Sequence, residues 1–400
     1  MTCSAKTASY GLVCMLGSIQ FGFTLNFGGL PIEGLKKEYP EWDYEKDKQK
    51  ISFFSNFASL FGSLGGFLVK ALVHFTNGKK SICILNVINC ILWLMYFLLT
   101  PKNLSVGIAL RSLQGVITGA FACFTPIMMT NMSNDDTVGM LGCMNQFGVV
   151  FGMIVFSIIG AFTNFKIIAI VGAIVDAVHA GLVFILPNEK PEKDKKETIF
   201  QKKYMRGFLT VLMLMVFQQF CGINAILDNL TKIMSSTGIY INENLQAALA
   251  SSSQLVSVLI SSFNMDVIGR RKMWAFSSSL IVISQILYII CLVVVNVGWF
   301  QASSVFLYLL SFGQGLGPIP WFICHDIFPR SLRLDGQMFV TFVNMVCSFG
   351  VTYLFPVMKE NMDEYVIMII YMCITFCAIP FGSHFIPRKE DVDDINLTLI

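Results

Sequence analysis

The sequence is poor in charge. Charged side chains make up 13% of its 400 residues, about half the fraction that is usual in soluble domains. Histidine is also scarce, with four scattered copies, and no Cys/His spacing has the form of a zinc site. These shortages argue against a soluble globular protein. We expect no metal, no cofactor and no nucleic-acid partner.

The twelve cysteines do not indicate a disulfide framework. All except Cys3 lie in or beside apolar runs, where cysteine behaves as a small hydrophobic residue. A cleavable signal peptide is not expected either, because the polar start Met1–Ser9 leads into an apolar run of full spanning length.

Apolar runs dominate what is present, with 55% hydrophobic residues and a mean hydropathy of +0.67. A helix needs about 20 apolar residues to cross a bilayer. The sequence therefore predicts an all-α integral membrane protein with twelve transmembrane helices. The expected spans are 10–30, 51–74, 80–99, 105–130, 138–162, 166–187, 207–231, 245–265, 273–296, 301–324, 336–357 and 364–386.

The two halves of the chain repeat. Gly78-Lys79-Lys80 returns as Gly269-Arg270-Arg271 191 residues later, and Pro126 and Pro318 are 192 residues apart. This predicts two six-helix bundles, at 1–187 and 207–386, with a linker at 188–206 and a tail at 387–400. Lys and Arg gather in the linker and in the other even-numbered loops, which predicts that both termini are cytosolic. The plasma membrane is the expected location.

Two spans carry residues that interrupt a helix. In the tenth, Gly315, Gly317, Pro318 and Pro320 precede Trp321, and such breaks occur at membrane depth where they line a cavity. In the seventh, five steps of about 100° separate Gln219 from Asn224, so Gln218, Gln219 and Asn224 share a face only if the helix unwinds near Gly222. We expect both breaks to border a binding site.

The tenth span and the charged segment after it resemble the sugar porters of the major facilitator superfamily, most closely the facilitative hexose transporters. The matching residues are Gly315 to Phe322, then Asp326, Phe328, Pro329 and Arg333. Gln218-Gln219 with Gly222 and Asn224 is likewise similar to the family's Gln-Gln-x-x-Gly-x-Asn. The resemblance implies a substrate held between two six-helix halves and moved by alternating access.

The resemblance also implies the sugar contacts. Neutral amides suit a sugar because each offers both donors and acceptors. The implied substrate-binding residues are Thr24, Gln146, Gln218, Gln219, Asn224, Asn229, Gln254, Trp321 and Asn344. The sequence departs from the family at Asp228 and Asn229, which replace two gating Tyr residues, at Gly313, which replaces a Glu, and at Met345, which replaces a Trp.

A charged gating network is implied by the same resemblance. Its expected members are Arg111, Asp266, Arg270, Arg271, Asp326, Arg330 and Arg333. Phe75, Asn131 and Val138 stand where the family has three further charges. Their loss predicts a resting equilibrium shifted toward the inward-open state.

The expected function is facilitative uniport of a hexose, most of all glucose, and not enzymatic catalysis. Proton-coupled relatives carry an Asp at the position of Thr24, and a threonine holds no transported proton. The alternatives are a proton-coupled symporter using Asp176 with His179 or Asp228, a sugar sensor, and a transporter of another small polyol. The expected partners are the hexose and the lipid bilayer, and the expected state is a monomer.

Overall fold

The computed structural model describes residues 5–133, 137–187, 197–228, 230, 233, 242–295 and 297–387. The elements within these ranges are helices, and no strand occurs among them. Nine of the helices are long and apolar enough to cross a membrane singly, and two bent pairs extend the number to eleven. The one remaining expected span, the tenth (301–324), is present as two helices separated by a break.

The first half of the chain forms six spans, two of which are bent. The first joins α1 (Ala5–Asn26) to α2 (Leu30–Glu38) at 50°, and the second joins α3 (Lys48–Gly62) to α4 (Gly65–Phe75) at 46°. The other spans are α5 (Gly78–Met95), α6 (Leu104–Asn131), α7 (Val138–Phe162) and α8 (Phe165–Leu182).

Helix α2 differs from the expectation, which left residues 31–50 as a connection between the first two spans. Gly28 and Gly29 follow α1, and Pro31 stands at the first turn of α2. Proline is well tolerated there because its missing N–H has no helical partner to lose. The helix therefore restarts in a new direction rather than ending.

The second half forms the other six spans, again with interruptions. Its helices are α9 (Lys202–Phe220), α10 (Ile223–Asp228), α12 (Glu243–Ile268), α13 (Arg270–Ile290), α14 (Gly298–Gln314), α15 (Ile319–Phe322), α16 (Cys324–Ile327), α17 (Arg330–Asn361) and α18 (Glu364–Phe385). Helix α9 begins inside the segment that was expected to be a linker. Much of that segment, 188–196, lies outside the described residues.

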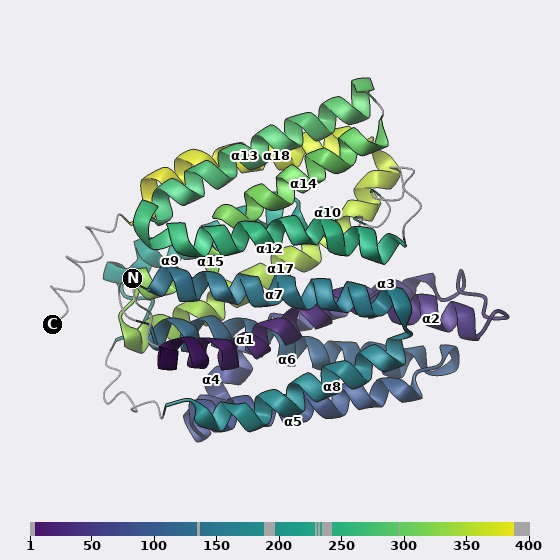
Figure 1. Cartoon of the computed structure of the whole chain (residues 1–400), viewed down its shortest axis with the longest axis horizontal. Coiled ribbons are helices and arrows are strands. Elements are labelled where there is room, and N and C mark those ends of the chain that lie inside the picture. The colour runs from purple at the N-terminus through teal and green to yellow at the C-terminus, as the bar shows by residue number, and fades with distance from the viewer. Residues whose placement is uncertain are drawn as a thin grey trace.

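The two halves lie side by side with their helices running roughly along one direction (Figure 1). Each half has its own hydrophobic core. Helices α7 and α12 pack against each other between the halves, and α17 packs against α3, α4 and α6. Helix α1 begins and α18 ends at the same end of the molecule (Figure 1), which we call the terminal end.

Glycines bring α6 very close to the bent second span. A Cβ on Gly119 would lie 1.9 Å from the Gly62 carbonyl oxygen, and one on Gly115 would lie 2.2 Å from that of Ala58. Small residues at such spacing allow helix backbones to approach in a membrane, where helix association depends on close packing. The Gly-x-x-x-Gly spacing of α6 therefore fixes this part of the N-terminal half.

We predict that Gly119→Val destabilises the protein by at least ~1–3 kcal/mol, because the added side chain must push α6 away from α3. Gly181→Val on α8 is the matched control, since a Cβ there meets nothing within 4 Å. The apparent melting temperature in detergent measures the difference. Equal melting temperatures for the two variants would show that the close approach contributes little.

Candidate functional site

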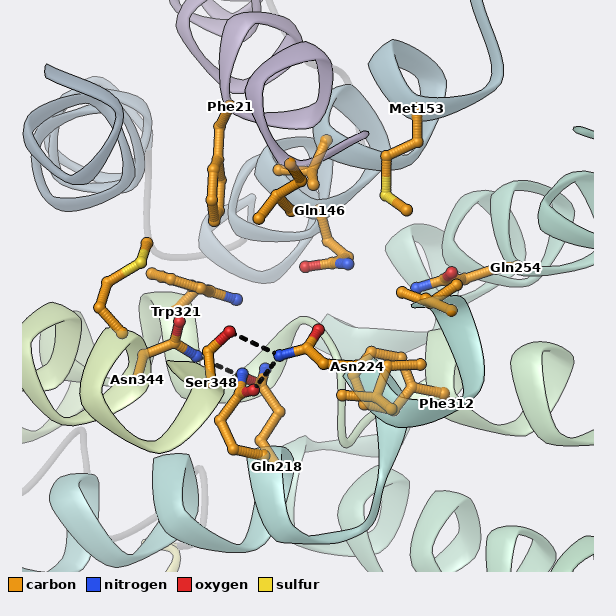
Figure 2. A pocket seen from close by; sticks show the side chains of 16 residues that line it. Phe21, Gln146, Met153, Gln218, Asn224, Gln254, Phe312, Trp321, Asn344 and Ser348 are labelled. Carbon is orange, nitrogen blue, oxygen red and sulfur yellow. Dashed lines mark hydrogen bonds between the residues drawn. The ribbon is translucent and has the colours of Figure 1, made fainter. Parts of the chain in front are cut away.

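A cavity lies between the two halves. Its lining surrounds about 510 Å³ of space, including the part that opens to solvent. Its lining comes from α1 and α7 on one side and from α9, α10, α12, α14, α15 and α17 on the other (Figure 2). The lining residues are Phe21, Leu25, Gln146, Val149, Met153, Gln218, Gln219, Ile223, Asn224, Leu227, Gln254, Phe312, Trp321, Asn344, Met345 and Ser348.

The seventh span is interrupted beside this cavity. Helix α9 ends at Phe220 and α10 begins at Ile223. Between them Gly222 has a φ of 91°, a conformation that favours glycine. A Cβ on Gly222 would also lie 2.6 Å from the Tyr371 ring. The interruption turns Asn224 toward the same cavity as Gln218 and Gln219.

Three side chains form hydrogen bonds with backbone groups around this interruption. The Cys221 carbonyl oxygen accepts from the Tyr308 hydroxyl at 3.1 Å and from Gln285 Nε2 at 2.9 Å. The Cys221 thiol donates to the Gln218 carbonyl oxygen at 2.9 Å. Inside a bilayer each freed backbone group needs such a partner, so Tyr308 and Gln285 hold the interruption in place.

The tenth span is interrupted beside the same cavity. Helix α14 ends at Gln314, and α15 begins at Ile319. Gln218 Nε2 donates to the carbonyl oxygens of Gly317 at 2.6 Å and Leu316 at 3.3 Å. One amide of the seventh span thus satisfies carbonyl groups that the break in the tenth span has freed.

An amide network connects the C-terminal helices around the cavity (Figure 2). Gln218 Oε1 accepts from Asn344 Nδ2 at 2.9 Å and from Gln219 Nε2 at 3.2 Å. Asn224 Nδ2 donates to Gln219 Oε1 at 2.5 Å and to the Ser348 hydroxyl at 2.8 Å. These polar groups are oriented before any ligand arrives.

Two other amides in the lining are not committed to protein partners. Gln146 makes no hydrogen bond with the described residues, and Gln254 Oε1 is buried without a partner among them. They come from opposite halves, Gln146 from α7 and Gln254 from α12. Figure 2 shows Gln146 reaching into the cavity from the side opposite Gln218, Asn224 and Asn344. A polar ligand between the halves would find both amides available.

The rest of the lining is apolar and partly aromatic. The Phe21 ring meets the Trp321 ring edge-on, with centroids 5.9 Å apart and planes at 75°. These two rings also join α1 to α15 across the interface. No charged side chain lines the cavity among the described residues. The site therefore suits a neutral ligand that has both hydroxyl groups and apolar faces.

Two residues expected at the site are not placed in it. Thr24 does not line the cavity, because its hydroxyl turns back to the Gln20 carbonyl oxygen at 3.0 Å. Asn229 lies outside the described residues. Conversely, Ser348 was not expected. Its signal was its position one helical turn after Asn344, on the same face of α17.

Arg111 does not join the ion pairs, contrary to the expectation. It is 1% exposed, and its guanidinium donates to the carbonyl oxygens of Thr24 at 3.1 Å and Phe54 at 3.3 Å. It also donates to Gln114 Oε1 at 3.1 Å. Arg111 therefore ties α1, α3 and α6 together inside the N-terminal half.

A compact charged cluster joins the halves near the terminal end. Arg270 contacts Asp266 at 3.0 Å and Asp326 at 2.9 Å. Asp266 also accepts from the backbone N–H groups of Gly139 and Met140, each at 2.9 Å. These N–H groups belong to the first turn of α7, where the helix dipole favours a negative charge. The backbone of α7 thus binds Asp266 directly, beside the position where Val138 replaces a charged residue.

The opposing arginine finds a neutral partner. Arg333 Nη1 donates to Asn131 Oδ1 at 3.1 Å, and Lys70 pairs with Asp335 at 3.1 Å. Both contacts cross between the halves. Asn131 therefore still binds Arg333, although it is neutral where the family resemblance implies a charged residue. We infer that the uncharged residues Phe75, Asn131 and Val138 weaken the contact between the halves at the terminal end less than the sequence alone implied.

Asp326 remains a strong acceptor in this cluster. Burial opposes ionisation of its carboxyl, but the charge of Arg270 and the neighbouring His325 outweigh it and lower the pKa of Asp326. The other two expected arginines do not extend the cluster. Arg271 donates to the Ile386 carbonyl oxygen at 2.8 Å, and Arg330 is exposed.

Gly313 allows α14 to pack closely against α12, a role that the family resemblance alone did not indicate. A Cβ at Gly313 would lie 2.8 Å from the Ser257 hydroxyl and 2.9 Å from the Gln254 carbonyl oxygen, so a larger side chain there would require α12 and α14 to shift. Around it, three serines spaced one turn apart on α12 donate to carbonyl oxygens of α14. The pairs are Ser253 with Phe306, Ser257 with Leu310 and Ser261 with Gln314.

Comparison with known proteins gives one family. The model described as "Sugar (and other) transporter" matches residues 10–188 and 186–392. A facilitated trehalose transporter of Bombyx mori is 23% identical over 406 residues, which cover 88% of this chain and 79% of the relative. That of Culex quinquefasciatus is 21% identical over 446 residues, which cover 97% and 84%.

Solved structures show the fold. The major facilitator proton:xylose symporter XylE, bound to 6-bromo-6-deoxy-D-glucose, has a TM-score of 0.85 at 17% identity, with 98% of this chain and 99% of that chain covered. The inward-open xylose transporter XylE from E. coli has a TM-score of 0.74 at 17% identity, with 97% and 99% covered. The expected fold of twelve transmembrane helices in two six-helix bundles is confirmed.

We predict that Tyr308→Phe loosens the interruption between α9 and α10, because it removes a hydroxyl that bonds the Cys221 carbonyl oxygen. The expected results are faster amide exchange across residues 218–223 and a stability loss of about 1 kcal/mol. Tyr353→Phe on the exposed face of α17 is the control. Exchange that stays at the wild-type rate in Tyr308→Phe would contradict this role.

Proposed function

The chain belongs to the sugar (and other) transporter family of the major facilitator superfamily, and from this we propose that it moves a hexose, most of all glucose, by facilitative uniport. Members of such a family transport a solute rather than transform it, so the chain is a transporter and not an enzyme. The observation that carries the proposal is the neutral cavity between the halves, with uncommitted amides from both.

A hexose ring matches this lining chemically. Its hydroxyl groups can exchange water for Gln146 and Gln254, while the oriented amides of Gln218, Gln219, Asn224 and Asn344 offer further donors and acceptors. Trp321 and Phe21 can cover an apolar face of the ring. The binding has to be weak enough for release. A millimolar affinity corresponds to about −4 kcal/mol, which a few neutral hydrogen bonds of about 1 kcal/mol each can supply.

Uniport is supported by the absence of an acid in the lining. The side chain at position 24 is a threonine, and no carboxylate lines the cavity among the side chains that the structure describes, which do not include that of Asp228. A proton-coupled carrier needs a group that gains and loses a proton as the site changes access. The amides and hydroxyls of this lining do not titrate near neutral pH.

A disaccharide is the second candidate substrate. The curated relatives named above are facilitated trehalose transporters, and Met345 takes the place of a tryptophan beside Asn344. A smaller side chain there leaves more room along α17. Trehalose therefore belongs in the same assay as glucose, and xylose does too because of the XylE likeness.

The arrangement in the cell completes the proposal. The basic residues of the even-numbered loops favour cytosolic termini, which makes the terminal end, with its charged cluster, the cytosolic gate. Closure there through Asp266, Asn131 and Arg333 would accompany an outward-facing cavity. We propose the plasma membrane as the location and a monomer as the transporting unit.

The test is uptake of radiolabelled glucose into proteoliposomes, with and without an imposed pH gradient. We predict uptake that does not depend on the gradient and that competes with unlabelled substrate. Gln146→Ala should raise the KM about 3- to 10-fold, the effect of one hydrogen bond of roughly 1 kcal/mol.

Asn361→Ala at the exposed end of α17 is the control for loss of an amide. Accumulation of glucose driven by the gradient would refute uniport. Flux of trehalose or xylose without flux of glucose would refute the hexose assignment and leave the family intact.

A further inference from the structure

Two buried polar pairs join α5 to α8, away from the cavity. Asn86 Oδ1 lies 3.1 Å from His179 Nδ1, and Asn89 Nδ2 donates to Asp176 Oδ2 at 2.8 Å. All four side chains are at most 1% exposed, and none of them lines the cavity. Two ionisable groups inside membrane-spanning helices are expensive, and such groups usually have a function.

His179 is neutral in this arrangement. Asn86 donates its own Nδ2 to the Ile82 carbonyl oxygen at 2.9 Å, so its Oδ1 accepts and His179 donates from Nδ1. The other ring nitrogen, Nε2, is buried without a partner among the described residues. A second proton on the ring would leave a charged N–H group unbonded there. His179 therefore supplies no positive charge to Asp176.

Asp176 has one hydrogen bond where an ionised carboxylate needs several. It receives Asn89 Nδ2 on Oδ2, makes no ion pair with the described residues, and keeps Oδ1 buried without a partner. Among the residues that the structure describes, the titratable side chains near it are Cys90 on α5 and His179, three positions further along α8. Neither offers a cation. An unpaired charge at this place is strongly unfavourable.

One proton removes the conflict. Asp176 Oδ1 and Asn89 Oδ1 are both acceptors without partners, so protonation of Oδ1 turns one of them into a donor. The proton comes from solvent, the O–H bond is the only bond formed, and the carboxyl becomes neutral. We propose that Asp176 and Asn89 form a proton-binding site, and that the neutral acid holds α8 on α5 throughout the sugar transport cycle.

Helix α1 connects the site to the cavity. Gln20 Nε2 donates to the Gly172 carbonyl oxygen of α8 at 2.6 Å, one turn from Asp176. The next residue, Phe21, lines the cavity and contacts Trp321. Figure 1 places α5 and α8 together at the edge of the N-terminal half that is farthest from the C-terminal half. Loss of the proton would free α8 and, through Gln20, disturb the wall that Phe21 forms.

Asp176→Asn tests the site, because an amide resembles the neutral acid and cannot ionise. Infrared spectra of the wild type should contain the carbonyl band of a protonated carboxylic acid, and the variant should lack it. Glucose uptake is then measured at equal pH on both sides of the vesicle, from acidic to alkaline pH. The wild type should lose uptake as the pH rises, whereas Asp176→Asn should keep uptake within about 2-fold of neutral wild type and lose the alkaline decline.

The infrared measurement needs no sugar, so it separates this proposal from the proposed function. Equal acid bands in both proteins would overturn the site. If Asp176→Asn folds but is inactive at every pH, the ionised carboxylate is required and the proposal is wrong. If uptake depends on sodium, a metal cation rather than a proton occupies the site. If protons move together with the sugar in the wild type but not in the variant, Asp176 carries a transported proton and does not retain it. If the variant fails to fold, loss of the wild-type band on alkaline titration, together with the loss of uptake, decides the question.

Discussion

The structure depends on a constraint of the bilayer: a helix that is broken inside the membrane frees backbone groups, and the protein itself must bond them. The C-terminal half has two such breaks, at Gly222 and at Gly315–Pro318. Gln218 bonds the carbonyls freed by the second, while Tyr308 and Gln285 bond the carbonyl beside the first. The amide network of the cavity is therefore a continuation of the bonds that make the breaks tolerable.

The two halves therefore make different contributions to the cavity. The C-terminal half supplies a prearranged polar wall, and its serine bonds from α12 to α14 stiffen that wall. The N-terminal half contributes one amide, Gln146, and the apolar side chains of Phe21, Leu25, Val149 and Met153. Contact at the terminal end is maintained by Asp266 on the first turn of α7 and by Arg333 on Asn131. Backbone N–H groups and the neutral side chain of Asn131 thus supply part of the contact between the halves.

Much of this was accessible from the sequence. Apolar run lengths predicted the twelve spans, and the glycine and proline positions predicted both breaks, because these features act locally along the chain. Seven of the nine expected contact residues line the cavity. Thr24 and Arg111 were misplaced because their bonds go to backbone carbonyls, which no side-chain motif reveals. Gly313 could not be interpreted because its neighbour, Ser257, lies 56 positions away in sequence and touches it only after α12 and α14 pack.

The central claim is that sugar occupies the cavity between Trp321 and the amide network. Intrinsic tryptophan fluorescence tests it directly, since Trp321 is the tryptophan in the cavity lining. Titration of the purified protein with glucose should change the emission in a saturable way, and Trp321→Phe should abolish that change while the protein remains folded. A saturable change that persists unaltered in Trp321→Phe would place the sugar elsewhere and contradict the account.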